Sequence, residues 1–470
     1  MNSSEGSITM MEGSGVKTGN IVERIIIRST TALRSYPWDY MVLIFLAWAI
    51  PAFYGLTNRY FIGFMNYESI VVDQSYEAME VSFEVLLEMF PVAMLALVAR
   101  YFTSKKKVSE ILFTAVIMQV VITVLFVVLV IIFADNFIDW INTPQEAQNL
   151  AMRYFRVRTI ALPFQTLSLL FIITIKAMRR GKLAVFLAFI GVLVNFLLDA
   201  IFISDYSFSF KLGLMGSAYD NIAANVFLCI VSGAVVLWIL RKEIVFKLSR
   251  KYFLEIFRIG KWTGLESFIR NLGYIVGVIA VVNYIGNYEE EAIGGYNTAI
   301  WVMWAIVLIP VLAWTEATQI AIGNAYGKKK IDLMKDIQIV STILMGLYMV
   351  AWVFIGIFSW GSISEWLNQG IEEDIVRYSV MTFGFLIFPY ILFAIGSGLK
   401  TVFIGTGRPM VIFISSAVVN LFIYVPLGLI VKYDILDVSY RDFLIITNVV
   451  FVLDFILICL FLWKYGYKKL

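Results

Sequence analysis

Apolar residues fill long stretches of this chain instead of alternating with polar ones. Each stretch reaches the roughly 20 residues that a helix needs to cross the hydrocarbon core of a bilayer. Pro51 and Pro310 lie inside two of them, where the missing backbone donor favours a kink. We predict an all-α membrane protein with twelve transmembrane helices, at residues 40–64, 82–102, 109–133, 155–177, 183–204, 213–240, 264–286, 296–321, 337–358, 379–403, 410–431 and 443–463.

Charged residues divide the loops into two kinds. Lysine and arginine cluster after every second span, for example at residues 105–107, 179–180 and 328–330. The loops between these clusters are acidic, for example at residues 289–291. Because cytoplasmic loops carry the excess of lysine and arginine, the alternation predicts a multi-pass protein with both termini in the cytoplasm.

The second half of the chain repeats the first. The matching positions are Ala99 and Gly323, Tyr154 and Tyr378, Asn58 and Asn283, and Asn195 and Asn420. Each half holds six spans, an even number, so both halves enter the membrane from the same side. The repeat is therefore parallel, with a pseudo-two-fold axis along the membrane normal. Tyr424 stands where the counterpart of Asp199 would be.

These patterns divide the chain into five segments. Residues 1–20 are expected to be a disordered cytoplasmic tail, and residues 21–36 an amphipathic helix along the inner membrane interface. Two six-helix lobes follow, at 37–240 and 263–465, joined by a basic cytoplasmic linker at 241–262. Two such lobes facing each other across a central cavity are typical of transporters.

Composition narrows the chemistry that is available. The 470 residues are 60% hydrophobic and 15% charged, with a mean hydropathy of +0.84, which excludes an ordinary soluble domain. The chain has no histidine, so any proton chemistry must use carboxylates. Cys229 and Cys459 lie in apolar runs without CxxC spacing and are expected to pack as small hydrophobic residues.

A carboxylate stands within the span at 183–204. Asp199 follows Asn195 by four residues, which puts both side chains on one helix face. An ionisable residue inside a span usually faces a cavity or the bundle interior and serves function. The alternative is a structural hydrogen bond that holds helices together.

Several short motifs occur near the ends of the spans. Arg258-Ile-Gly-Lys-Trp-Thr-Gly-Leu-Glu266 leads into the seventh span, and Asn195-x-x-x-Asp199 precedes Gly213-x-x-Gly216. Leu97-Val-Ala-Arg-Tyr101 and Gly323-Asn-Ala-Tyr-Gly327 end the second and eighth spans. In this order the motifs resemble those of the multidrug and toxic compound extrusion (MATE) transporters, within the superfamily of multidrug, oligosaccharidyl-lipid and polysaccharide exporters. Trp262 stands where that family usually has proline.

For prokaryotic members, this resemblance implies a cell (inner) membrane exporter of organic cations in exchange for Na⁺ or H⁺, without another cofactor. The family's cation site, carried over by position, is Asn58, Asn195, Asp199 and Asn221. The family usually has aspartate at the first of these positions and often threonine at the last. Asp199 would either bind Na⁺ with amide oxygens of Asn195 and Asn221 or take up a proton.

Other acidic residues are candidates for binding the cargo. Glu80, Glu84 and Glu88 recur every four residues, and Glu88 lies deepest and could attract a cation. A solvated stripe along an outer vestibule is the alternative. Arg153, Arg156 and Arg158 are expected to snorkel to the outer interface, although a flippase would use them to hold phosphate.

In the second lobe we select Glu266, Glu316 and Trp314 as substrate-binding residues, together with Asn283. A carboxylate beside aromatic faces suits a bulky cation. A salt bridge from Glu266 to Lys261 or Arg270 is the competing interpretation.

The sequence thus predicts a monomeric secondary transporter whose partners are a small organic cation and the lipid bilayer, with no nucleic acid. The alternative is a lipid-linked saccharide flippase of the same superfamily, whose cavity would be cationic, whereas the deep charges identified are mainly acidic. A membrane-embedded prenyl- or glycosyl-transferase would need an Asp-Asp-x-x-Asp cluster, which the sequence lacks.

Overall fold

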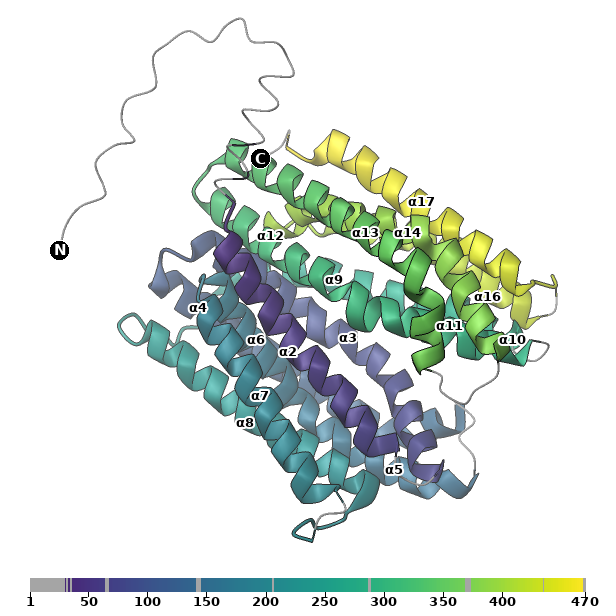
Figure 1. Ribbon diagram of the computed structural model, residues 1–470. Helices are drawn as coiled ribbons and strands as arrows, with labels where there is room; N and C mark the ends of the chain where they lie inside the picture. The colour runs from purple at the N-terminus through teal and green to yellow at the C-terminus, as the bar shows by residue number, and fades with distance from the viewer. Residues whose placement is uncertain are drawn as a thin grey trace, which may run out of the picture. The chain divides into compact units, whose positions relative to one another are not determined.

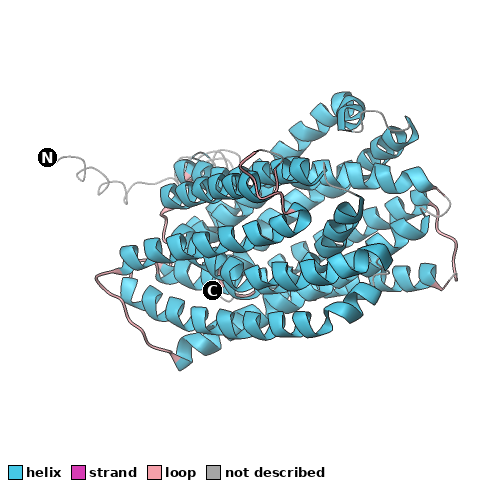
Figure 2. Cartoon of the chain, turned by 90° about the horizontal axis from the view of Figure 1, so that it is seen from below, coloured by secondary structure: helices cyan, strands magenta, loops and turns pink. Residues whose placement is uncertain are grey.

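A computed structural model describes residues 36–63, 67–140, 145–204, 207–285, 289–367, 373–433 and 435–467, together with residues 30 and 33. The expected tail at 1–20 and nearly all of the expected amphipathic helix at 21–36 lie outside the described residues. Residues 37–470 form one compact unit. All regular elements in the described part of this unit are helices joined by loops (Figure 2).

The first half of the unit supplies seven α-helices and one 3₁₀ turn, η1. Their bounds are α2 (Trp38–Gly63), α3 (Tyr67–Tyr101), α4 (Lys105–Trp140), α5 (Gln145–Arg158), η1 (Thr159–Ala161), α6 (Leu162–Ala177), α7 (Gly181–Phe202) and α8 (Gly213–Leu240).

The second half supplies nine α-helices and three π-helical turns, η2, η3 and η4. Their bounds are α9 (Arg250–Tyr274), η2 (Ile275–Ile279), α10 (Ala280–Ile285), α11 (Glu290–Val302), η3 (Met303–Val307), α12 (Ile309–Gly327), α13 (Ile331–Leu367), α14 (Glu373–Gly405), α15 (Met410–Val419), η4 (Asn420–Tyr424), α16 (Val425–Lys432) and α17 (Tyr440–Tyr465).

Each of the twelve expected spans coincides with one of these helices or with a run of joined helices. Within the described residues, eight are long and apolar enough to cross a membrane unaided, and a bent pair makes a ninth. That pair, Glu291–Val307 and Ile309–Gly327, is bent by 44° beside Pro310, as the sequence predicts. By contrast, α2 continues through Pro51 to Gly63.

Figure 1 shows the two halves as separate groups of helices, α2–α8 in purple to teal and α9–α17 in green to yellow. Helix α3 packs along α9 and α12, and α2 also packs on α12, so these helices form the interface between the halves. The expected linker at 241–262 is irregular only before α9. From Arg250 onward it is helical, because this segment packs against α3 and α4.

The basic loops gather at one end of the bundle. Arg179 lies 5.9 Å and Lys328 5.1 Å from the Phe102 ring centroid, so the loops after α6, α12 and α3 meet there. Arg100 Nη2 also donates to the Thr406 carbonyl, at 2.7 Å, and thereby ties the first half to the second. We call this the basic end, and the opposite one the acidic end.

The three π-helical turns all lie in the second half, and two of them touch. A π turn is wider than an α turn and is frequent at functional sites. η2 packs against η4, the turn that contains Asn420 and Tyr424. A Cβ atom at Gly277 would overlap the Tyr424 carbonyl, so this crossing requires glycine. The counterpart of the Asn195–Asp199 segment is therefore packed backbone to backbone.

We expect Gly277→Ala to destabilise the protein by about 1–3 kcal/mol, because the added methyl group overpacks the crossing of η2 and η4. Gly384→Ala in α14 is the matched control, since a Cβ there meets no atom within 4 Å. Thermal unfolding in detergent measures both variants. Equal melting temperatures for the two variants would contradict this account.

Candidate functional site

Two buried carboxyl groups meet in the first half. Asp199 lies in the last turn of α7 and Asp220 about two turns into α8, and their exposed fractions are 0% and 4%. A hydrogen bond joins the two side chains. Two buried carboxyl groups this close cannot both be ionised at low cost, so the arrangement suits a shared proton.

The connection between the two helices explains why the carboxyl groups meet. The chain turns back between Phe202 and Gly213, and the Leu212 amide donates to the Phe202 carbonyl at 2.9 Å. A Cβ at Gly216 would lie 2.7 Å from that same carbonyl oxygen, so glycine permits the close approach of α8 to the end of α7. With a rise of about 1.5 Å per residue from Gly181, Asp199 stands about 27 Å from the basic end.

The structure places the other predicted cation ligands as follows. The Asn195 amide donates to the Gly191 carbonyl one turn below, at 3.0 Å. Both the carbonyl and the side-chain oxygen of Asn221 accept from the Asn225 amide, at 2.8 and 3.2 Å. The side chain of Asn58 lies outside the described residues. The cation-binding role of these three residues stays a prediction.

Sequence reasoning missed Asp220, which stands next to the selected Asn221. The signal was present, because Asp220 is the one acidic residue within the apolar run of α8. An isolated carboxylate in such a run is a candidate functional residue for the same reason as Asp199 in α7.

The positive charge of Arg158 acts on the Asp220 carboxyl group. Its guanidinium group donates to Glu80 Oε1 at 3.1 Å and to the Tyr154 hydroxyl. It also lies over the Tyr76 ring, 4.4 Å from the centroid. These partners leave only 11% of the Arg158 side chain exposed, and its snorkelling to the outer interface stays a prediction. Arg153 is exposed, and Arg156 pairs with Asp135.

An ion pair joins the two halves nearer the basic end. Lys176 Nζ on α6 lies 2.9 Å from Glu316 Oε2 on α12, and both side chains are at most 10% exposed. The Trp48 indole nitrogen donates to the same carboxylate oxygen. Trp314, which we selected with Glu316, packs edge to face on Trp38, with 6.4 Å between the ring centroids.

Glu88 and Glu266 both face Arg270. Arg270 Nη2 lies 2.8 Å from Glu88 Oε1 and 3.6 Å from Glu84 Oε2, which links α9 to α3 across the interface. Glu266 interacts with Arg270 and accepts a hydrogen bond from Ser416. Two of the acidic residues on α3, Glu84 and Glu88, are therefore paired with the guanidinium group of Arg270. The predicted substrate-binding roles of Glu88 and Glu266 stay predictions, and the Asn283 side chain lies outside the described residues.

A second cation in this region is also paired. Lys400 Nζ lies 2.8 Å from Asp454 Oδ2, and Ser415 donates to Asp454 Oδ1 at 2.6 Å. Beside these carboxylates the bundle also holds four basic residues, each of which is paired with a carboxylate. These are Arg158, Lys176, Arg270 and Lys400.

The model of the MatE family matches residues 78–201 and 265–430, which is more than half of the chain and includes both lobes. The chain belongs to the MATE transporters. Membership makes it a multi-pass membrane transporter and not an enzyme, as the sequence predicts.

Solved MATE structures share the fold of this chain. An outward-facing MATE transporter of the MOP superfamily is 18% identical, with a TM-score of 0.80, over 94% of this chain and 99% of that one. A variant of the Vibrio cholerae transporter VcmN is 14% identical, also with a TM-score of 0.80, over 94% of this chain and 100% of that one. A MOP superfamily transporter from Pyrococcus furiosus, described as having a binding pocket of reverse polarity, is 16% identical with a TM-score of 0.78, over 94% and 97% of the two chains.

One curated protein is similar to this chain at the level of sequence. The probable multidrug resistance protein YoeA of Bacillus subtilis (strain 168) is 22% identical over 218 residues. The match covers 44% of this chain and 45% of that relative, so the chain spans less than half the length of the relative that it matches.

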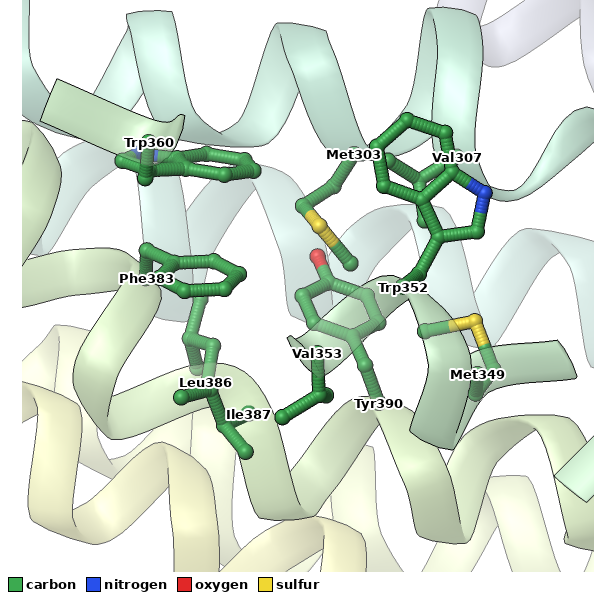
Figure 3. A pocket seen from close by; sticks show the side chains of 10 residues that line it. All are labelled: Met303, Val307, Met349, Trp352, Val353, Trp360, Phe383, Leu386, Ile387 and Tyr390. Atoms are coloured by element: carbon green, nitrogen blue, oxygen red, sulfur yellow. The ribbon is translucent and has the colours of Figure 1, made fainter. Parts of the chain in front are cut away.

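This MATE chain also has an apolar pocket in its second half (Figure 3). The pocket lies between η3, α13 and α14. The Trp360 and Phe383 rings stack at 4.1 Å on one side, and the Tyr390 hydroxyl points towards Met303. No charged side chain lines this pocket, and none of the predicted site residues does.

We expect Lys176→Met to destabilise the transporter by about 3–5 kcal/mol, because it leaves the Glu316 carboxylate buried without its cation. The double variant Lys176→Met with Glu316→Gln should recover most of this loss, since it removes the unpaired charge. Thermal unfolding of the wild type, both single variants and the double variant gives the coupling energy. Strictly additive effects would show that the ion pair does not connect the halves energetically.

Proposed function

We propose that this protein is a secondary active exporter that moves organic cations out of a prokaryotic cell by alternating access, in exchange for protons. The observation that carries the proposal is the buried carboxyl pair of Asp199 and Asp220. A pair that holds one proton in its joined form can release it when water reaches the site, and this gives the transporter two charge states.

The direction of transport follows from the charge of the loops. By the positive-inside rule, the basic end faces the cytoplasm. The contacts of Arg100 with Thr406 and of Lys176 with Glu316 close the interface towards that end. Both termini would then be cytoplasmic, and the structure would correspond to a state that faces outward.

The donor set favours H⁺ over Na⁺ as the coupling ion. A sodium site would need several oxygen ligands around Asp199. The described hydrogen bonds of Asn195 and Asn221 run along their own helices instead, and the Asp199 carboxyl is bonded to another carboxyl. This arrangement suits one proton between two acids.

The charge balance favours a cationic cargo. Each of the four interior basic residues is paired with a carboxylate, so none offers an unneutralised positive charge to a phosphate. Carboxylates outnumber these bases, because Glu84, Glu266, Asp199 and Asp220 are present in addition to the carboxylates of the four ion pairs. The lipid-linked saccharide flippase is the less favoured function for this reason. We propose that the transporter works as a monomer in the bilayer.

In the proposed cycle the carboxyl pair takes up one proton from the outside, which leaves a single negative charge, and it discharges that proton towards the cytoplasm. When the proton leaves, two adjacent negative charges repel each other, and the buried site must admit water or a cation. The repulsion favours a larger separation of α7 and α8. This movement is the step that would prepare the first half to bind cargo.

Transport by purified protein in liposomes tests the proposal. A pH gradient should drive movement of a fluorescent organic cation, whereas a Na⁺ gradient of the same size should not. Asp199→Asn and Asp220→Asn should each reduce the rate to that measured without a gradient, because a lone carboxyl beside an amide has no second acid with which to share a proton or from which it is repelled when the proton leaves. Asp332→Asn is the control, since its side chain is 88% exposed.

Three outcomes would contradict the proposal. Transport that follows the Na⁺ gradient would assign the coupling to Na⁺. Unchanged, proton-dependent transport by both aspartate variants would remove the pair from the mechanism. No response to either gradient would favour a flippase or an uncoupled carrier.

A further inference from the structure

Exposed apolar and basic side chains cover the segment that joins the two halves. Residues 246–258 comprise the end of the irregular linker and the first turns of α9. Their apolar side chains that are 41–72% exposed are Phe246, Leu248, Phe253, Leu254 and Phe257. The exposed basic residues among them are Lys247, Arg250, Lys251 and Arg258. We call residues 246–258 the linker surface.

The irregular part of the linker surface is fixed along α4. The Ser249 amide donates to Thr114 Oγ1 at 3.2 Å. The Phe246 ring meets the Phe113 ring edge to face, with 5.6 Å between the centroids, yet 72% of Phe246 remains exposed. The segment therefore lies with one side on the bundle and presents the other side outward.

The first turns of α9 have three distinct sides, because successive residues of a helix are about 100° apart. Tyr252 is buried against α3. Phe253 and Phe257 lie on an exposed side, where their rings stack with 6.4 Å between the centroids. Lys251 and Arg258 share the third side, which is also exposed. An apolar strip edged by basic residues is typical of a helix at the surface of a bilayer.

The linker surface borders the apolar face that the bundle presents to lipid. On α4 the exposed apolar side chains begin at Val121, and residues 108–120 are buried or half-buried. With a rise of about 1.5 Å per residue, Phe113 lies about 12 Å from Val121 towards the basic end. The linker surface beside Phe113 is thus at the edge of the apolar band, where a bilayer has its headgroups.

The bases of the linker surface have no counter-ion from the protein. Within the described part of the chain, no ion pair involves Lys247, Arg250, Lys251 or Arg258. Glu255 is the one acidic residue between positions 246 and 258, so this stretch carries a net charge of +3. The phosphate groups of anionic lipids are the complement of such a charge at the membrane surface.

We propose that the linker surface binds anionic phospholipids. The exposed bases hold the phosphate groups, and the apolar side chains lie among the first carbons of the acyl chains. Burial of apolar area and attraction to anionic headgroups act together in binding to a bilayer. Because the linker connects the two halves, the bound lipid holds the start of α9 at the membrane surface. This inference concerns the lipid around the transporter and does not rest on the proton exchange proposed above.

Titration of the purified protein in detergent with dioleoylphosphatidylglycerol tests this inference, with the rise in melting temperature as the readout. This anionic lipid should stabilise the wild type at a lower concentration than dioleoylphosphatidylcholine does. Arg250→Gln with Lys251→Gln should raise the concentration of anionic lipid that is needed about tenfold or more, because each base near an anionic surface adds to the affinity.

The matched control is Lys182→Gln with Lys330→Gln. It removes two exposed bases from the same end of the bundle, outside the linker surface, and should behave like the wild type. Leu254→Gln should weaken the effect of both lipids, because it removes apolar contact without changing the charge. Glycerol 3-phosphate, which has the phosphate but no acyl chains, should not raise the melting temperature.

Any of four results overturns the inference. The Arg250 and Lys251 double variant could keep the wild-type preference for the anionic lipid, or the control could lose that preference to the same extent. Equal stabilisation by glycerol 3-phosphate would indicate a site for soluble phosphate. A change from dimer to monomer in the double variant, measured by light scattering, would make the linker surface an interface between two copies of the chain.

Discussion

An ionised side chain inside a membrane-embedded bundle must be neutralised, and this constraint governs how the helices of this protein meet. Lys176 and Glu316 neutralise each other across the two halves, and so do Arg270 and Glu88. Asp199 and Asp220 are instead brought together as two acids, and in the proposed cycle a proton takes the place of the missing cation. Because that proton can leave, the charge of this pair can change, whereas the ion pairs keep their charges.

The two halves repeat the fold without repeating the chemistry. In the first half, α7 and α8 bring two carboxyl groups together, and the charge of Arg158 acts on one of them. In the second half, the corresponding segment is the π turn of Asn420 and Tyr424, and η2 packs so closely on it that Gly277 has no room for a side chain. A duplicated architecture has thus kept an ionisable site in one half and a rigid crossing in the other. In the proposed cycle, such a division would let one half respond to protons while the other provides a fixed surface.

The sequence predicts the spans well, because apolar length is a local property that each segment carries by itself. It also selects Asp199, since a lone carboxylate in an apolar run is unusual. The sequence is a poorer guide to how deeply a charged side chain is buried and to which residue it pairs with. Arg158 is near the start of its apolar run, yet Glu80 and Tyr76, far away in the sequence, leave little of its side chain exposed. Asp220 can be recognised as part of the site only when the turn between α7 and α8 places it beside Asp199. Partners contributed by other helices decide these sites, and a single segment does not contain that information.

The bond between Lys176 and Glu316 has a consequence for the electrical behaviour of the protein. Opposite charges held 2.9 Å apart carry no net charge as a pair, so moving the closed end as a unit through the membrane field requires almost no electrical work. A transmembrane voltage acts on net charge, at about 2.3 kcal/mol per elementary charge for each 100 mV. The voltage sensitivity of the cycle would then come from the protons and the cargo that cross. The membrane potential would act on the transported protons and cargo, and the helices themselves would add almost no voltage dependence.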